Sequence, residues 1–295
     1  MSLKIATCQY ETELGNKEEN LSRSLKWIEK AGEHNPDLIV LPELITTGYK
    51  AGEKFLEMAE PVPGETTEKW GEKAEKFGTY LIGGMCRRDE SVRGKIYNSA
   101  VLINSEGSVA GVYDKVILPL YVHTLRDESG NPVLIDEADL FCAGNSLPVF
   151  ETEIGTIGVQ ICQDAVYPEM TRVQVLKGAD IIVQILNGPA VETEHEKDIT
   201  PLTTRVHAFD NSTYIVLANK CGSEEFEYSG SPMSVTFHGE SHIVDPEGNF
   251  VSRAKVEEED LLLGEIELEK VEKARWGMKL LRDWRPELFQ ELGRR

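Results

Sequence analysis

Three residues of different chemical type each stand at the end of a predicted strand. Glu43 follows the apolar run DLIVLP, Lys115 ends the stretch GSVAGVYDK, and Cys162 ends the stretch TIGVQIC. In open α/β sheets, functional sites lie beyond the carboxyl ends of strands, so these three side chains are candidates for one site. A carboxylate, an ammonium group and a thiol supply a base, a cation and a nucleophile. The sequence therefore predicts acyl transfer with Cys162 as the nucleophile.

Each of these residues taken alone has an ordinary structural explanation. A cysteine at a strand end is most often a small buried hydrophobe, a glutamate after Leu-Pro can cap a turn, and a lysine after a strand is usually solvated. The sequence contains no GxSxG, P-loop or GxGxxG motif. His238 and His242 have a metal-like spacing, but the glutamate is misplaced for HExxH and the context is a strand. We therefore expect no metal and no organic cofactor.

Apolar runs and helical periodicities alternate along the chain and define the elements that must position these residues. Hairpins mixed with crossovers imply helices packed on the outer faces of sheets, and no linker divides the chain. The predicted helices are 21–31, 63–77, 169–177, 203–210 and 276–281. The predicted strands are 3–9, 37–41, 80–86, 96–103, 108–113, 157–161, 180–186, 214–218, 242–245, 249–253 and 261–267.

The composition is that of an acidic globular protein. Of the 295 residues 40% are hydrophobic, and 31 Lys and Arg against 51 Asp and Glu give a net charge of -20, which disfavours binding to nucleic acid or anionic membranes. The start MSLKIATCQY lacks the features of a secretory signal, and no apolar run is long enough to span a membrane. The five cysteines form no CxxC pair, which argues against a zinc or disulfide framework. We expect a reduced, cytoplasmic protein.

Six segments, in order, resemble the nitrilase, or carbon–nitrogen hydrolase, superfamily. They are LPEL (41–44), YDKV (113–116), GVQICQDAVYPEM (158–170), KGADIIV (177–183), RVHAFDNSTYIVLAN (205–219) and HIVDPEGNF (242–250). Together they extend over nearly the whole chain, which makes the match specific. The resemblance implies an α/β fold, the four-layer αββα sandwich of that family as a single domain. It also implies that Glu43, Lys115 and Cys162 form the Glu-Lys-Cys triad of that family.

The same resemblance implies a fourth catalytic residue, Glu137. The family pattern has a second glutamate shortly before F-x-x-G, and Glu137 begins the segment EADLFCAG, which matches that spacing. Asp136 and Asp139 are near alternatives. By this resemblance Glu137 would hold Lys115 and orient the substrate nitrogen.

These residues can carry an amide through a complete reaction cycle. A thiol with an ordinary pKa of about 8.5 is mostly protonated at neutral pH, so Glu43 would take the proton of Cys162 before the sulfur attacks the carbonyl carbon. Lys115 and the backbone N–H of Gln163 would stabilise the oxyanion. Glu43 would then protonate the leaving nitrogen and activate the water that hydrolyses the thioester.

The residues after the nucleophile favour an amide substrate over a nitrile. Nitrile-cleaving members of the superfamily usually have Trp-Glu after the cysteine, whereas this chain has Gln163-Asp164. We predict a hydrolase of small linear amides that releases ammonia or an amine. An N-carbamoyl amino acid hydrolase is the alternative, and a nitrilase or an acyltransferase ranks below both. The predicted residues of the substrate pocket are Tyr49, Tyr167, Asn187 and Gly188, together with Gln163.

A long insert between Lys115 and Glu137 contains two further candidates, His123 and Arg126. Such inserts resemble those of N-carbamoyl amino acid hydrolases, where basic residues can meet a substrate carboxylate. The alternative is a surface loop without a role in binding.

The predicted hydrolase domain comprises residues 1–270, and residues 271–295 form a charged C-terminal tail. The resemblance implies at least a homodimer, formed through outer helices and this tail.

Overall fold

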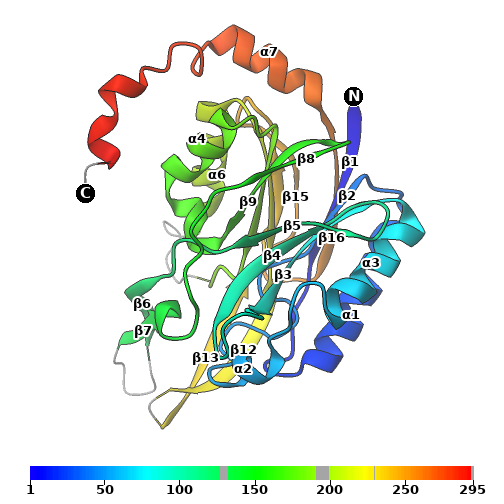
Figure 1. The fold of residues 1–295 in the computed structure, drawn as a ribbon, viewed down its shortest axis with the longest axis vertical. Coiled ribbons are helices and arrows are strands. Elements are labelled where there is room, and N and C mark those ends of the chain that lie inside the picture. The colour runs from blue at the N-terminus through cyan, green and yellow to red at the C-terminus, as the bar shows by residue number, and fades with distance from the viewer. Residues whose placement is uncertain (127–131, 191–198, 229, 294–295) are drawn as a thin grey trace.

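In this computed structural model of the protein, two six-stranded sheets lie face to face (Figure 1). The structure describes residues 1–126, 132–190, 199–228 and 230–293, and the side chains of residues 120–136, 228, 231 and 291 are outside this description. The first sheet has the strand order β16-β1-β2-β3-β4-β5 and the second has the order β15-β14-β11-β10-β9-β8. The strands of the first sheet are β1 (Ser2–Gln9), β2 (Leu38–Val40), β3 (Tyr80–Arg88), β4 (Ile96–Ile103), β5 (Val109–Asp114) and β16 (Asp260–Glu267). Those of the second are β8 (Val149–Thr152), β9 (Gly155–Ile161), β10 (Ile181–Leu186), β11 (Tyr214–Asn219), β14 (His242–Val244) and β15 (Phe250–Arg253).

Both sheets have parallel strands at the centre and antiparallel strands on either side. β1, β2 and β3 pair in parallel, as do β9, β10 and β11. The central strands β2 and β10 are buried along their whole length, and such strands have continuous apolar sequences. The carboxyl ends of parallel strands meet at one edge of a sheet, so the residues that follow them are brought together.

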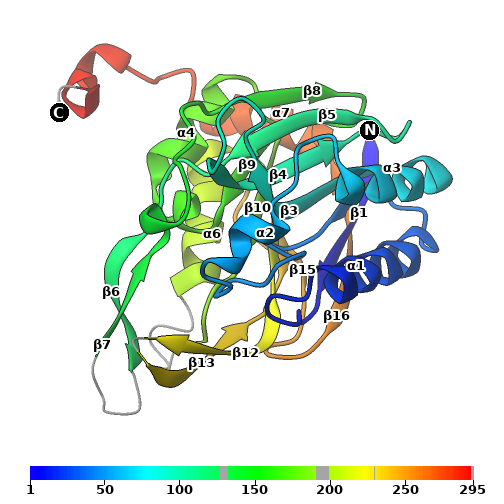
Figure 2. The same cartoon turned by 60° about the horizontal axis from the view of Figure 1, so that its bottom comes forward.

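Helices cover the outer face of each sheet (Figure 2). The helices α1 (Lys17–Gly32) and α3 (Glu65–Phe77) pack on the first sheet, and α4 (Pro168–Leu176) and α6 (Ile199–Asn211) pack on the second. Successive side chains of a strand point to opposite faces, so Ile5 packs against the second sheet while Ala6 packs against α1 and α3. The layers follow the order helix, sheet, sheet, helix, and the predicted αββα sandwich is confirmed.

Two hairpins and several short helices complete the fold. The hairpins are β6 (Leu120–Arg126) with β7 (Pro132–Asp136), and β12 (Cys221–Tyr228) with β13 (Ser231–His238). The apolar periodicity predicts none of these strands. In β12 the reason is physical, because the charged residue Glu224 occupies a buried position where alternation would require an apolar one. The short helices are α2 (Lys54–Met58), η1 (Glu137–Asp139), η2 (Cys162–Val166), η3 (Pro286–Leu288) and η4 (Gln290–Gly293).

The C-terminal helix differs from its prediction. The sequence predicts a helix over 276–281, whereas α7 spans Leu268–Met278. Lys279 has a φ of +59°, and this left-handed conformation ends the helix. Within the described residues, no helix combines the length and the apolar character needed to cross a membrane.

Candidate active site

Cys162 follows β9 directly and is the first residue of η2, in a sharp turn of the chain. Its φ is +47°, in the left-handed region, which costs a non-glycine residue on the order of 1–3 kcal/mol. Strain of this kind clusters at active sites, where the surrounding structure holds a reactive side chain in place. The first N–H groups of a helical turn have no partner within that turn, so the N–H of Gln163 is a donor next to the thiol.

Asp164 holds this turn and connects it to the segment that contains Lys115. Its Oδ2 accepts hydrogen bonds from the Ile161 N–H at 3.0 Å and from the Tyr113 hydroxyl at 2.7 Å. Its Oδ1 accepts a hydrogen bond from the Ile117 N–H at 2.9 Å. Burial raises the pKa of Asp164, although these three hydrogen bonds favour the ionised form. One carboxylate therefore fixes the end of β9 against the end of β5.

Glu43 follows β2 and is fully buried. Its Oε1 accepts hydrogen bonds from Lys115 Nζ at 3.0 Å and from Asn98 Nδ2 at 2.7 Å. Its Oε2 accepts a hydrogen bond from the backbone N–H of Asn187 at 2.8 Å. This last bond joins the end of β2 to the end of β10, so both sheets contribute to the position of one carboxylate.

Lys115 lies between two glutamates. Its Nζ is 2.9 Å and 2.8 Å from the two carboxylate oxygens of Glu137, in addition to its contact with Glu43. The Tyr49 hydroxyl donates a hydrogen bond to Oε1 of Glu137 at 2.7 Å. Glu137 is 4% exposed, whereas Asp139 is an exposed residue. The structure thus places Glu137, and not Asp139, against Lys115.

Burial and mutual charge shift the acid–base behaviour of the group. Burial raises the pKa of Glu43, Lys115 opposes this shift, and Glu137 adds to it. Burial also raises the pKa of Cys162, Glu43 adds to this shift, and Lys115 opposes it. For Lys115, burial disfavours the charge, but Glu137 and Glu43 outweigh it and hold its pKa well above the ordinary value. The site therefore combines a protonated thiol and a fixed ammonium group with a glutamate shifted toward the range of a general base.

Asn187 and Gly188 follow β10, at the strand end where the sequence predicts pocket residues. The Asn187 side chain is 1% exposed, and within the described residues neither its Oδ1 nor its Nδ2 has a hydrogen-bond partner. Buried polar groups are normally paired, so this amide is available to a ligand. The N–H of Gly188, by contrast, already has a partner within the protein, because it donates to Oδ1 of Asn219 at 2.8 Å.

Of the remaining predicted pocket residues, the structure describes the side chain of Tyr167 but not those of His123 and Arg126. Tyr167 precedes α4 and is 42% exposed, and no described hydrogen bond connects it to Glu43, Lys115, Glu137 or Cys162. His123 and Arg126 lie on β6, and their side chains are outside the described part of the structure, as is that of Asp136. Their roles stay predictions.

The two histidines with metal-like spacing bind groups of the protein. His238 Nε2 is 3.1 Å from Oε2 of Glu240, and His242 Nδ1 is 2.7 Å from the Glu240 carbonyl oxygen. In the part of the chain that the structure describes, no group of three or more His, Cys, Asp or Glu residues could hold a metal ion.

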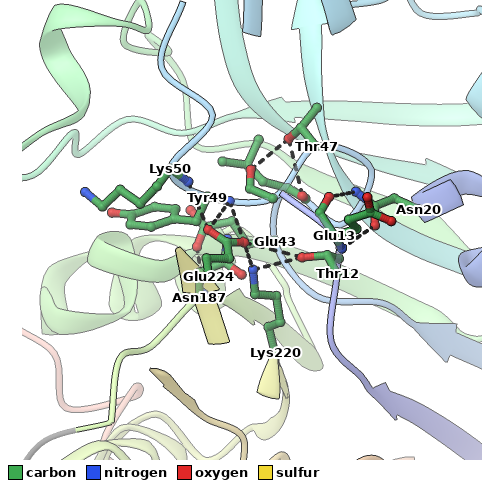
Figure 3. A network of polar contacts seen from close by, with 12 residues as sticks. Thr12, Glu13, Asn20, Glu43, Thr47, Tyr49, Lys50, Asn187, Lys220 and Glu224 are labelled. Carbon is green, nitrogen blue, oxygen red and sulfur yellow. Dashed lines mark hydrogen bonds and ion pairs between the residues drawn. The ribbon is translucent and has the colours of Figure 1, made fainter. Parts of the chain in front are cut away.

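Sequence reasoning missed several polar residues that hold the site together. Asn98 and Asp164 each bind groups that are distant in sequence. Figure 3 shows Lys220 and Glu224 beside Tyr49 and Glu43, where the lysine and the glutamate form a buried ion pair. One available signal is a polar residue inside an otherwise apolar strand, as in IYNSAVLI around Asn98.

A known protein family matches most of this chain. The family model "Carbon-nitrogen hydrolase" matches residues 4–275. The chain belongs to this family. Among curated carbon–nitrogen hydrolase relatives it is 30% identical over 296 residues to a probable nitrilase of Schizosaccharomyces pombe, with 99% of each chain covered. It is 29% identical to an omega-amidase of Xenopus tropicalis, with 92% of each chain covered.

A solved carbon–nitrogen hydrolase from Helicobacter pylori G27 has the same fold. Its TM-score is 0.86 at 26% identity, and the match covers 99% of this chain and 98% of that one. The resemblance to the nitrilase superfamily is therefore confirmed, and membership in the carbon–nitrogen hydrolase family supports a hydrolase.

Proposed function

We propose that the protein hydrolyses a small linear amide through a thioester on Cys162. The observation that carries the proposal is the Lys115 ammonium group, held between Glu43 and Glu137 beside a cysteine in a strained turn. A protein that only bound a ligand would need no nucleophile, base and buried cation in one place. Membership in the carbon–nitrogen hydrolase family supports cleavage of a carbon–nitrogen bond.

In the first half-reaction, Glu43 removes the proton of Cys162 as the sulfur attacks the carbonyl carbon of the amide. The oxyanion that forms accepts hydrogen bonds from Lys115 and from the N–H of Gln163, and one such donor is worth about 3–4 kcal/mol. Glu43 then gives the proton to the nitrogen, the C–N bond breaks, and ammonia or an amine leaves. An acyl thioester remains on Cys162.

In the second half-reaction, Glu43 deprotonates a water molecule that attacks the thioester carbonyl carbon. The C–S bond breaks, the carboxylic acid product forms, and Glu43 returns its proton to Cys162. A raised pKa suits this double role, because a group whose pKa lies near the working pH both takes and gives a proton readily. Glu137 exchanges no proton in this cycle and holds Lys115.

Two observations support an amide rather than a nitrile. Gln163-Asp164 stands where nitrile-cleaving members of the superfamily usually have Trp-Glu. A relative that aligns with most of the chain is an omega-amidase.

The experiment that tests this function is to trap the acyl enzyme with a slowly hydrolysed amide and to weigh the intact protein. The wild type should gain the mass of the acyl group, and Cys162→Ala should gain none. Cys142 is the matched control, because it is also partly buried and free, and Cys142→Ser should still form the adduct. Normal amide turnover by Cys162→Ala would show that the mechanism is wrong.

The surroundings of Lys50 support a second candidate function, the hydrolysis of N-carbamoyl amino acids. Its Nζ lies 4.9 Å from the ring centroid of Tyr49 and 5.7 Å from that of Phe226. Among the described residues no carboxylate lies within ion-pair distance of this Nζ. A cation without such a partner, next to a tyrosine that binds Glu137, can pair with the carboxylate that every N-carbamoyl amino acid carries.

This second candidate is tested with two substrates, a ureido acid and a neutral amide. Lys50→Met or Arg126→Ala should raise KM for the ureido acid by about tenfold or more, because a charge-assisted hydrogen bond is lost. Turnover of the neutral amide should be spared. Equal effects on both substrates would contradict a carboxylate-binding role.

A further inference from the structure

Lys220 and Glu224 form a buried ion pair that the reaction cycle does not use. They are 1% and 2% exposed, and the ammonium group contacts the carboxylate directly. The Thr12 hydroxyl lies 3.0 Å from Lys220 Nζ. Removing two charges from water offsets much of their attraction, so a buried ion pair is weak evidence for stability. Its partners indicate a different role.

Glu224 holds the backbone at Tyr49 and Lys50 (Figure 3). The Tyr49 N–H lies 3.0 Å and 3.1 Å from the two carboxylate oxygens, and the Lys50 N–H donates to one of them at 3.1 Å. Gly48 permits this close approach, because a Cβ atom at that position would lie 2.8 Å from Oε1 of Glu224. The carboxylate therefore fixes the backbone position of Tyr49, from which its side chain extends.

Lys220 constrains the side-chain ring of Tyr49. The Nζ of Lys220 lies 3.9 Å from the centroid of the Phe237 ring. Phe237 packs edge-on against Tyr49, with ring centroids 6.2 Å apart and an interplanar angle of 90°. The two members of the ion pair thus constrain both the backbone and the ring of Tyr49.

We propose that the Lys220–Glu224 ion pair positions Tyr49 and, through its hydroxyl group, positions Glu137 and Lys115 for the reaction. The hydroxyl of Tyr49 donates to Glu137 at 2.7 Å, and Glu137 holds Lys115. Lys220 and Glu224 are positioning residues, since they act through Tyr49. The inference rests on the proposed amide hydrolysis. A misplacement of about 1 Å in a catalytic group can cost roughly 10²-fold in rate.

The first test compares Glu224→Gln, Lys220→Met and the double variant on a neutral amide. Each should lower kcat by about tenfold to one-hundredfold, with little change in KM. The double variant leaves no unpaired buried charge, so it should recover thermal stability relative to Lys220→Met without recovering kcat. Asp245→Asn is the matched control, because it removes an ion pair with Lys270 at 2.5 Å in another part of the molecule. It should lower stability and leave kcat unchanged.

The second test asks whether the effect passes through Tyr49. In a Tyr49→Phe background, Glu224→Gln should reduce kcat by much less than in the wild type, because both changes break the same connection. If the two effects multiply independently, or if kcat recovers together with stability in the double variant, the ion pair has only a structural role and the proposal is overturned.

A third measurement separates this inference from the proposed function. Alkylation of Cys162 by iodoacetamide, followed by mass spectrometry of the modified peptide, requires no amide turnover. Lys115 lowers the pKa of Cys162, so displacement of Lys115 in Glu224→Gln should slow alkylation at neutral pH. An unchanged rate would overturn the positioning role. Absence of wild-type activity on every amide would instead contradict the proposed function alone.

Discussion

Glu43 accepts three hydrogen bonds, and burial nevertheless raises its pKa. Because Glu43 must be ionised to take the proton of Cys162, kcat/KM should fall as the pH drops through a value above the ~4.3 of an ordinary glutamate. Asn98 favours the ionised form of Glu43 through its hydrogen bond, so Asn98→Ala should move this acid limb to higher pH. The measurement is kcat/KM against pH for a neutral amide. An acid limb at or below ~4.3, or a downward shift in Asn98→Ala, would contradict Glu43 as the base.

Glu137 is the carboxylate of the segment 136–139 that the structure shows in contact with Lys115. Glu137→Gln should keep the fold and bind substrate while kcat falls by about 10²–10⁴, the range for a positioned acid–base or orienting group. Single-turnover kinetics and circular dichroism measure the two properties. Asp139 is exposed, and Asp139→Asn should change turnover much less. The same is expected of Asp136→Asn. The assignment is misplaced if one of these two variants is inactive and Glu137→Gln is active.

At the scale of elements, the turn that presents Cys162 depends on a side chain that takes no part in the reaction. Asp164 accepts hydrogen bonds from the end of β9 and from two groups on either side of Lys115. Asp164→Asn keeps the size of the side chain but has only one good acceptor. We expect the free energy of unfolding to fall by about 1–3 kcal/mol and kcat to fall with it, because the strained Cys162 loses its support.

Urea unfolding and amide turnover of Asp164→Asn measure these two effects. Tyr113→Phe is the milder control, because it removes one of the three donors and leaves the carboxylate in place. Unchanged stability in Asp164→Asn would mean that the turn is held by other contacts.

At the scale of the whole molecule, large apolar side chains are exposed on the outer helical layer of the second sheet. We propose that a second copy of the chain covers this layer, since the family resemblance implies pairing through outer helices and the C-terminal tail. Trp276 on α7 is 82% exposed as well. The exposed residues of α6 are Ile199 (49%), Leu202 (53%), Val206 (44%) and Phe209 (40%).

Light scattering during size-exclusion chromatography should therefore give at least twice the chain mass of 33.0 kDa. Leu202→Glu with Val206→Glu should shift the protein to the monomer, because burying two unpaired carboxylates is unfavourable. Leu56→Glu is the control, since Leu56 is 52% exposed on α2. A wild-type monomer, or a dimer that survives the α6 changes, would contradict this interface.

The amino-acid sequence by itself determined the strands of both sheets except β8 (Val149–Thr152), and it determined the position of Glu43, Lys115 and Cys162 at strand ends. It could do so because apolar runs and strand ends are local features, so each can be recognised within a few residues. The sequence also placed Asn187 after a buried strand, and its motifs indicated the family and the layers of the fold.

Only the tertiary structure decided which distant groups meet. Glu43 binds the backbone of Asn187 across 144 positions of sequence, and Tyr113 binds Asp164 across 51. The buried Glu224, which interrupts the apolar alternation of β12, likewise binds the backbone N–H of Tyr49 across 175 positions. Such contacts depend on how the two sheets stack and where a hairpin folds back. The interaction partners of each buried charge offset the cost of burying it, and no local sequence pattern contains these partners.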